Sequence, residues 1–244
     1  MGLEIALFIV GVLIIIVTIA SGITSLWLMR RYFKYNRIEN SLGLTGVEIA
    51  RKILDDNDLE HIKVKRTGSL LFGNSYSHYF KNVRLRGFIR HEKSITSIGI
   101  ASQKAALAIL DKEGDPDMKK RIRLVPLVTF GPFAFIPLVL IGAVLDYYLL
   151  NGSGVSTIVL GTIGLSFYVY AIVLSVMTLK TEKKAQNRAY EILENDYHIT
   201  AEELAALKEV FKLYNIQYIN DIILSTLELI QTILRIAIAM KKDN

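Results

Sequence analysis

The chain has 244 residues, of which 52% are hydrophobic and 21% charged, and it contains no cysteine. This apolar content is too high for an ordinary soluble domain and too low for a protein made only of membrane-spanning helices. The absence of cysteine excludes disulfides, zinc sites built on thiolates and cysteine nucleophiles. It also fits a protein that faces the cytosol.

The first predicted element is an N-terminal membrane anchor. Residues 3–28 are apolar, and they exceed the roughly 20 helical residues that cross a bilayer. The flank before them carries Glu4 and no Lys or Arg, and no cleavage site follows. We therefore expect an uncleaved anchor rather than a signal peptide.

A small domain of helices and strands follows the anchor. Thr45 and Glu48 have the spacing of a capping box and predict the start of a helix. Segments 61–68 and 82–89 alternate apolar with polar residues, which predicts two half-buried strands. The turn-rich segment between them, 69–80, is compatible with another strand.

Residues 97–110, SIGIASQKAALAIL, predict a buried helix that is capped by Ser94 or Thr96. Small and apolar residues dominate it, yet Gln103 and Lys104 lie side by side in its middle. Polar groups in a buried helix need partners, so this pair marks a place where other polar residues are expected.

Two further apolar stretches, 124–145 and 155–179, predict a membrane hairpin. Glycines at the start of the second stretch are typical of close helix packing. A polar helix is predicted directly after it. Thr200 and Glu203 then form a second capping box, which predicts the start of another helix.

The last apolar stretch, 219–240, carries Asp221, Glu228 and Arg235 at intervals of seven residues. Residues with this spacing lie on one helical face. We favour a structural interpretation, in which the helix is partly inserted or lies against the cytoplasmic domain. A proton path is the functional alternative, because ionisable residues within a membrane span are often functional.

The distribution of charge predicts the orientation in the membrane. Residues 30–123 hold 20 Lys and Arg against 11 Asp and Glu, a net charge of +9, whereas the loop 146–154 has no Lys or Arg. Positive loops stay in the cytoplasm, so we expect residues 29–123 and the segment from Lys180 onward inside and the N-terminus outside. Basic domains also bind nucleic acid, but the basic residues here are interspersed with acids and a membrane anchor already explains the excess, so no nucleic-acid partner is expected.

The chain is therefore expected to be a mostly helical α+β protein, with three to four membrane helices and a small α+β domain in the cytoplasm. It would be a multi-pass protein of the cell membrane. The predicted regions are a transmembrane anchor (1–28), a cytoplasmic domain (29–123), a transmembrane hairpin (124–179), and cytoplasmic helices with a C-terminal amphipathic or membrane helix (180–244).

Several segments resemble one family. LTGVEIARKILDDNDL, VRL, SITSIGIAS and TEKKAQNRAYEIL are similar, in this order, to segments of the YugP-like membrane zinc metallopeptidases. The resemblance covers roughly residues 25–240 and implies a zincin-like cytoplasmic domain. In that family the helix after ISxxSxAS carries H-E-x-x-H, whose two His bind zinc while the Glu activates water. A Glu that opens E-x-x-A-x-x-R-A past the third span supplies a third ligand.

This sequence departs from the family at three of those positions. Gln103 replaces the first His, Lys104 the general-base Glu and Leu107 the second His, whereas Glu182 keeps the third-ligand position in EKKAQNRA. By the resemblance, Lys104 and Glu182 face one spot. We therefore predict that Lys104 and Gln103 pair with Glu182 as the remnant of a metal site, and that Leu107 fills the volume of the second His. The alternative is that Lys104 extends to solvent and Glu182 is a surface residue.

The family's DHYDP segment appears here as NSYSH, which keeps Tyr76 and ends in His78. Both residues are expected in the groove. The four histidines of the chain include no H-x-x-x-H pair. Zinc held by His78, His91 and Glu182 is an alternative ligand set, but its histidines would approach from loops. No metal and no other cofactor is expected.

The sequence thus favours a catalytically inactive membrane metallopeptidase homologue, not an enzyme, that binds or regulates a protein partner. The partner would be a membrane or cytoplasmic protein, with a homologous active peptidase as one case and a second copy of the chain as another. The lipid bilayer is the other expected partner of the chain. Two alternatives stay open: a structural membrane subunit, and a metallopeptidase with an atypical zinc site.

Overall fold

The structure is a computed structural model that describes residues 2–67, 73–128 and 134–242. Helices dominate it, and η2 is a short π-helix. In chain order the elements are α1 (Gly2–Asn36), α2 (Gly46–Asp55), β1 (Lys63–Arg66), β2 (Ser75–Ser77), β3 (Asn82–Leu85), α3 (Gly87–His91), α4 (Ile95–Lys112), α5 (Pro116–Val128), α6 (Phe135–Leu149), α7 (Val155–Glu191), η2 (Ile192–Asp196) and α8 (Ala201–Lys242).

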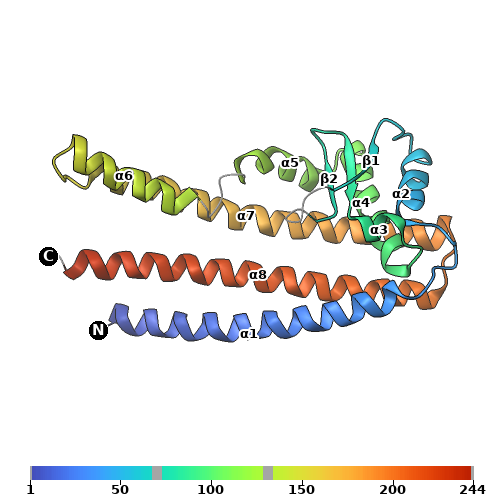
Figure 1. Ribbon diagram of the computed structural model, residues 1–244, viewed down its shortest axis with the longest axis horizontal. Coiled ribbons are helices and arrows are strands. Elements are labelled where there is room, and N and C mark those ends of the chain that lie inside the picture. The colour runs from blue at the N-terminus through green and yellow to red at the C-terminus, as the bar shows by residue number, and fades with distance from the viewer. Residues whose placement is uncertain (1, 68–72, 129–133, 243–244) are drawn as a thin grey trace. The chain divides into compact units, whose positions relative to one another are not determined.

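The chain forms two compact units. Unit 1 comprises Met1–Ser21, Arg123–Thr178 and Ile219–Asn244, and unit 2 comprises Gly22–Ile122 and Leu179–Tyr218. The three long helices α1, α7 and α8 contribute residues to both units (Figure 1). The strands and the helices α2, α3 and α4 belong wholly to unit 2.

Among the described residues, three helices are long and apolar enough to cross a membrane: Gly2–Asn36, Val155–Asp196 and Ala201–Ala239. The first and third apolar stretches predicted from the sequence are therefore confirmed as parts of such helices, and the fourth lies within α8. The second stretch, 124–145, is only partly described, because residues 129–133 lie outside the described ranges. Its described C-terminal part belongs to α6, a shorter apolar helix of 15 residues.

Within unit 1, glycines let α6 and α7 approach closely. A Cβ atom on Gly142 would lie 2.6 Å from the Cα of Thr157, and one on Gly164 would lie 2.9 Å from the Cα of Phe135. The Asp146 carboxylate accepts hydrogen bonds from the backbone N–H (2.8 Å) and the hydroxyl (2.7 Å) of Thr157 in the first turn of α7. An acidic side chain stabilises a helix N-terminus in this way. The close-packing interpretation of the glycines holds at Gly164.

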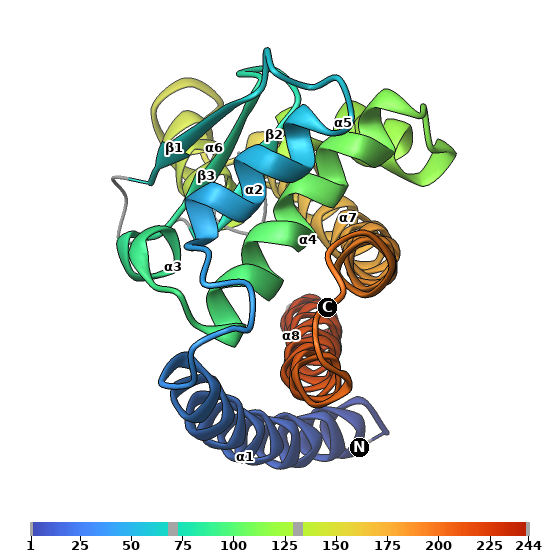
Figure 2. The same cartoon turned by 90° about the vertical axis from the view of Figure 1, so that its right-hand side faces the viewer.

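Unit 2 is built on two neighbouring helices, α2 and α4, and on a small sheet (Figure 2). The three strands in the described residues have the order β1-β3-β2, with β1 parallel and β2 antiparallel to β3. β3 is thus the central strand, and its Val83 and Leu85 are fully buried.

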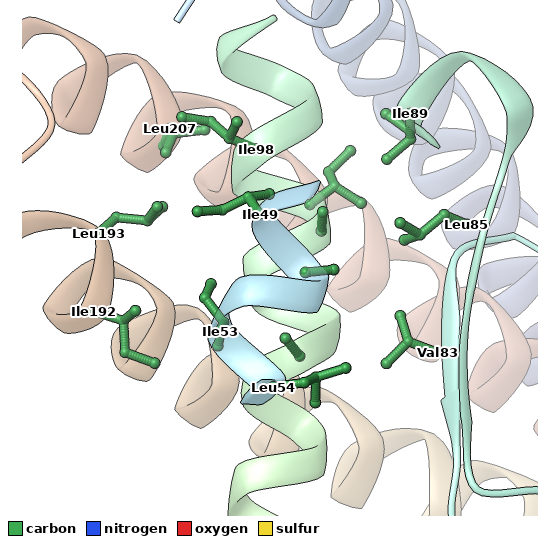
Figure 3. Packing of buried hydrophobic residues seen from close by; sticks show 14 of the residues in the cluster. Ile49, Ile53, Leu54, Val83, Leu85, Ile89, Ile98, Ile192, Leu193 and Leu207 are labelled. Carbon is green, nitrogen blue, oxygen red and sulfur yellow. The ribbon is translucent and has the colours of Figure 1, made fainter. Parts of the chain in front are cut away.

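Apolar side chains from α2, β3, α3 and α4 converge in one core, which Ile192, Leu193 and Leu207 complete from the C-terminal part of the chain (Figure 3). Burying a side chain of this size stabilises a fold by about 1.5–3 kcal/mol. Because the core joins residues from both segments of unit 2, α4 has a fixed position relative to the end of α7.

The helices of unit 2 begin where the sequence predicts. The Thr45 N–H donates to Glu48 Oε2 (2.7 Å), and the Glu48 N–H donates to Thr45 Oγ1 (3.4 Å), which confirms the capping box of α2. The side chain of Ser94 caps α4. The second capping box, between Thr200 and Glu203, is also present and starts α8.

The structure corrects several predicted boundaries. The strand predicted at 61–68 extends only over Lys63–Arg66, and the strand predicted at 82–89 ends at Leu85 because α3 begins at Gly87. The additional strand that the sequence permits in the segment 69–80 is present as β2. The polar helix predicted after the third span is continuous with α7, and the fourth apolar stretch is continuous with the helix before it. No Gly or Pro interrupts either junction, so nothing in the sequence breaks these helices.

Gly46 opens α2 at a point where the backbone of α3 approaches it. A Cβ at this position would lie 2.1 Å from the carbonyl oxygen of Ile89, so Gly46→Ala must displace backbone. We expect this substitution to lower the free energy of unfolding by about 1–3 kcal/mol, measured by thermal unfolding of the full chain in detergent. Gly22→Ala is the control, because Gly22 lies in α1 with nothing within 4 Å of its Cβ position. Equal unfolding temperatures for the Gly46→Ala variant and the wild type would contradict the packing.

Candidate functional site

α4 places two long polar side chains inside unit 2. All of its residues from Ile95 to Leu110 are buried, including Gln103 at 6% and Lys104 at 9% exposure. An amide or an ammonium group in such a place is costly unless it is hydrogen-bonded or paired with an opposite charge. The partners of these two residues therefore define the site.

Gln103 and Lys104 both bind Glu182 of α7. Gln103 Nε2 donates to Glu182 Oε2 at 2.9 Å, and Lys104 Nζ donates to the same oxygen at 2.7 Å. The predicted contact between Lys104 and Glu182 is thus present, and the alternative in which Lys104 extends to solvent does not hold. Their side chains are only 11% and 15% exposed.

Arg121 of α5 also contacts Glu182, and no sequence pattern indicated this contact. Its Nη2 lies 3.2 Å from Glu182 Oε1, and its Nη1 donates to Thr181 Oγ1 at 3.3 Å. Arg121 stands in the basic run MKKRIR, which resembles an ordinary positive flank of a membrane span. We call Gln103, Lys104, Arg121 and Glu182 the Glu182 cluster. It holds two cations and one carboxylate.

Leu107 lies one turn after this pair and is fully buried. It packs in a second apolar cluster with Ala106 and Leu110 of α4, Met118 of α5, and Ala185 and Ala189 of α7. This agrees with the prediction that hydrocarbon fills this position. This second apolar cluster also holds α4 against α7, the helix that carries Glu182.

Tyr76 and His78, predicted to lie in the groove, meet at Asp111 instead. The Tyr76 hydroxyl donates to Asp111 Oδ2 at 2.6 Å, and His78 Nδ1 lies 2.6 Å from the same oxygen. Burial, together with the hydrogen bond to Asp111, raises the pKa of the Tyr76 phenol above its ordinary value. The alternative zinc ligands His78, His91 and Glu182 are not brought together among the described residues.

A cavity of about 620 Å³ lies beside α4, and all of its lining residues belong to unit 2. Gln103, Lys104 and Glu182 form part of its wall. The other lining residues include amides, phenols, one further cation and apolar side chains from α1, α7 and α8. Such a mixture of apolar surface and few polar groups is typical of a binding site.

Comparison with known proteins assigns the chain to a family. A family model described as "Putative neutral zinc metallopeptidase" matches residues 10–237. The chain belongs to this family. A relative from Bacillus subtilis (strain 168), named "Putative membrane protease YugP", is 28% identical over an alignment of 228 residues that covers 91% of this chain and 96% of the relative. No solved structure matches the chain.

The names of the neutral zinc metallopeptidase family and of the relative point to an enzyme. The expectation from the sequence that the chain is not an enzyme is therefore wrong. It rested on Gln103, Lys104 and Leu107 at the motif positions, whereas the names describe the family and the relative as wholes. The relative is named a membrane protease, and three helices among the described residues could cross a bilayer, so the chain is a membrane protein.

Zinc, which the family name implies, does not fit the residues at the motif positions. Zinc is bound by imidazole, carboxylate or thiolate groups, whereas Gln103, Lys104 and Leu107 supply an amide, an ammonium group and hydrocarbon. The two carboxylate oxygens of Glu182 already contact cations. In the part of the chain that the structure describes, no group of three or more His, Cys, Asp and Glu residues could hold a metal.

Lys104→Met removes one of the two cations beside Glu182. We expect it to lower the free energy of unfolding by about 1–3 kcal/mol, less than for a fully buried pair because Arg121 stays beside the carboxylate. Adding Glu182→Gln should recover part of this loss, with a coupling energy of about 0.5–3 kcal/mol. Denaturant unfolding of the two single variants and the double variant measures this coupling.

The control for this cycle is Lys112→Met. Lys112 pairs with Asp58, but their side chains are 43% and 90% exposed, and exposed pairs contribute at most about 1 kcal/mol. If the effects of Lys104→Met and Glu182→Gln simply add, the two residues are not coupled and the cluster does not stabilise unit 2.

Proposed function

We propose that this membrane protein binds a polypeptide segment of a protein partner in the cavity beside α4. The observation that carries the proposal is the cavity of about 620 Å³ that Gln103, Lys104 and Glu182 line. This volume lies within the range of ordinary ligand sites. The partner would be a membrane or cytoplasmic protein, and a homologous peptidase that the chain regulates belongs to this class.

The lining of the cavity supports a polypeptide as the occupant. A peptide backbone needs hydrogen-bond donors and acceptors, and its side chains need apolar contacts. Gln186 and Asn215 line the cavity and exchange hydrogen bonds of 2.8 and 3.0 Å between their amides. Leu28 and Phe211 add apolar surface. The family and the relative are also named for peptidases, whose substrates are polypeptides.

In this proposal the Glu182 cluster is what remains of the family's metal site. The ammonium group of Lys104 lies where a cation would balance the carboxylate, and Gln103 donates from the position of the first ligand. An internal ion pair keeps its geometry without added metal, so the wall of the cavity does not depend on zinc.

Peptide hydrolysis in the same cavity is the second candidate, and the names of the family and the relative favour it. A zinc-dependent reaction would then require ligands other than the side chains at the motif positions, which is the atypical zinc site left open by the sequence. A structural membrane subunit remains the third alternative, and it predicts no occupant for the cavity.

We also propose that the protein is multi-pass and that unit 2 faces the cytoplasm. The net charge of +9 over residues 30–123 supports this orientation. The loop between α6 and α7, which has no Lys or Arg, would lie outside.

A pool of random decapeptides tests the first proposal against the second. The full chain, immobilised in detergent with zinc chloride present, is incubated with the pool, and the retained peptides are identified by mass spectrometry. We expect intact peptides to be retained. Met29→Trp should reduce their retention at least about tenfold, since a bulky side chain would occupy the cavity that Met29 lines.

Leu26→Trp is the matched control, because Leu26 lies on the same helix, is similarly exposed and does not line the cavity. Shortened peptides that disappear with Glu182→Gln would support hydrolysis instead of binding alone. If the wild type neither retains nor shortens any peptide, this result would support the structural-subunit alternative.

The orientation is tested with single introduced cysteines, since the chain has none of its own. A membrane-impermeant maleimide added to intact cells should label a Ser153→Cys variant, whose residue is exposed in the loop between α6 and α7. It should not label a Glu60→Cys variant, whose residue is exposed in unit 2. The reverse labelling pattern would show that unit 2 lies outside.

A further inference from the structure

We propose that the cavity contains a subsite for a carboxylate of the bound polypeptide, formed by the guanidinium of Arg86 and the hydroxyl of Tyr32. This inference rests on the proposed function, since it specifies what the cavity selects in a peptide. Both residues line the cavity, and neither belongs to the Glu182 cluster. No motif of the sequence pointed to either of them.

Arg86 is a cation in the cavity wall without a partner of opposite charge. Its backbone is fixed at the start of α3, where the Arg86 N–H donates to Asn74 Oδ1 at 2.7 Å. Among the described residues, no carboxylate lies within ion-pair distance of its side chain, whereas the cluster's Lys104 and Arg121 both contact Glu182. A guanidinium group beside a cavity binds carboxylates well, because its two parallel N–H groups match the two oxygens.

Tyr32 of α1 supplies the second, independent observation. Its hydroxyl is buried and has no hydrogen-bond partner among the described residues, which is rare for a buried polar atom and calls for an explanation. The ring is held edge-on by Phe88 at 6.1 Å between centroids. Tyr32 and Arg86 line the same cavity, and in this proposal both donate to one acceptor. Because the hydroxyl has almost no accessible surface, a small movement of the Tyr32 ring must accompany its donation to a carboxylate oxygen.

The charges around the cavity favour an anion. Lys104 and Arg121 together exceed Glu182 by one positive charge, and Arg86 adds another, so this region repels cationic groups and attracts anionic ones. The phosphate of a membrane lipid is also anionic. A peptide is favoured because the amides of Asn74, Gln186 and Asn215 line the same space and can serve a peptide backbone.

Three decapeptide pools test this subsite with the full chain in neutral detergent. The first pool lacks Asp and Glu and is amidated at the C-terminus, the second is the same with a free C-terminal carboxylate, and the third is amidated but contains Asp and Glu. We expect the second or third pool to be retained at least about tenfold better than the first. Comparing the second with the third shows whether the carboxylate comes from a chain terminus or from a side chain.

Two variants assign the preference to the subsite. Arg86→Gln should abolish the preference for carboxylates, and Arg84→Gln, a charge loss outside the cavity lining, should leave it intact. Tyr32→Phe should weaken the preference without lowering the unfolding temperature, because it removes an unpaired buried hydroxyl. A lower unfolding temperature with an unchanged preference would show that Tyr32 is only structural.

The outcomes separate the subsite from the proposed function. Equal retention of all three pools, or a preference that survives Arg86→Gln, overturns the subsite while polypeptide binding stands. Retention of no pool overturns both. The same preparations, reconstituted in nanodiscs that contain phosphatidylglycerol, are analysed for bound lipid. Arg86-dependent retention of this lipid in place of peptide would overturn the proposal by assigning the cavity to a membrane phosphate.

Discussion

A carboxylate that is only 15% exposed needs donors and cations around it, and the Glu182 cluster supplies them from two other helices. α4 contributes Lys104 and Gln103, α5 contributes Arg121, and α7 carries the acid. Leu107 and its apolar neighbours pack beside this contact. The interaction is largely buried, so removing one of its charged members changes the charge balance of a buried site. The wall of the cavity depends on this arrangement.

In the family that the sequence resembles, the motif places zinc ligands at the corresponding positions, and zinc needs several ligands that donate electron pairs. Here the positive charge beside Glu182 belongs to the protein itself, as an ammonium and a guanidinium group on separate helices. One consequence is electrostatic, because the two cations exceed the carboxylate by one positive charge. Arg86, the further cation that lines the cavity, forms no ion pair among the described residues, and Glu182 of the same lining is already paired with Lys104 and Arg121.

The membrane segments and the site are also linked by continuous secondary structure. α7 begins as an apolar helix that could cross a bilayer and continues without a break to Glu182 and beyond. α8 runs in the same uninterrupted way, from its capping box into the last apolar stretch. Residues of the cavity wall therefore stand on the same helices as candidate membrane spans, with no flexible linker in α7 or α8.

Local features of this protein follow from the sequence by itself. The capping boxes at Thr45 and Thr200, the apolar stretches at 3–28 and 155–179, and the loss of the family's zinc ligands can all be read from neighbouring residues. Short-range patterns of this kind fix helix starts and burial, since they act within a turn or two. The pairing of Lys104 with Glu182 was predictable only through the resemblance to a family.

The remaining features depend on which distant segments meet. Arg121 looks like one basic residue among several until α5 places it beside Glu182. The sequence predicts Tyr76 and His78 in the groove, yet both side chains contact Asp111 at the end of α4. Arg86 and Tyr32 share a cavity wall although one precedes a short helix and the other lies in the first long one. Only the packing of the folded chain determines these contacts, because no local pattern encodes the partner of a side chain that lies far away in the sequence.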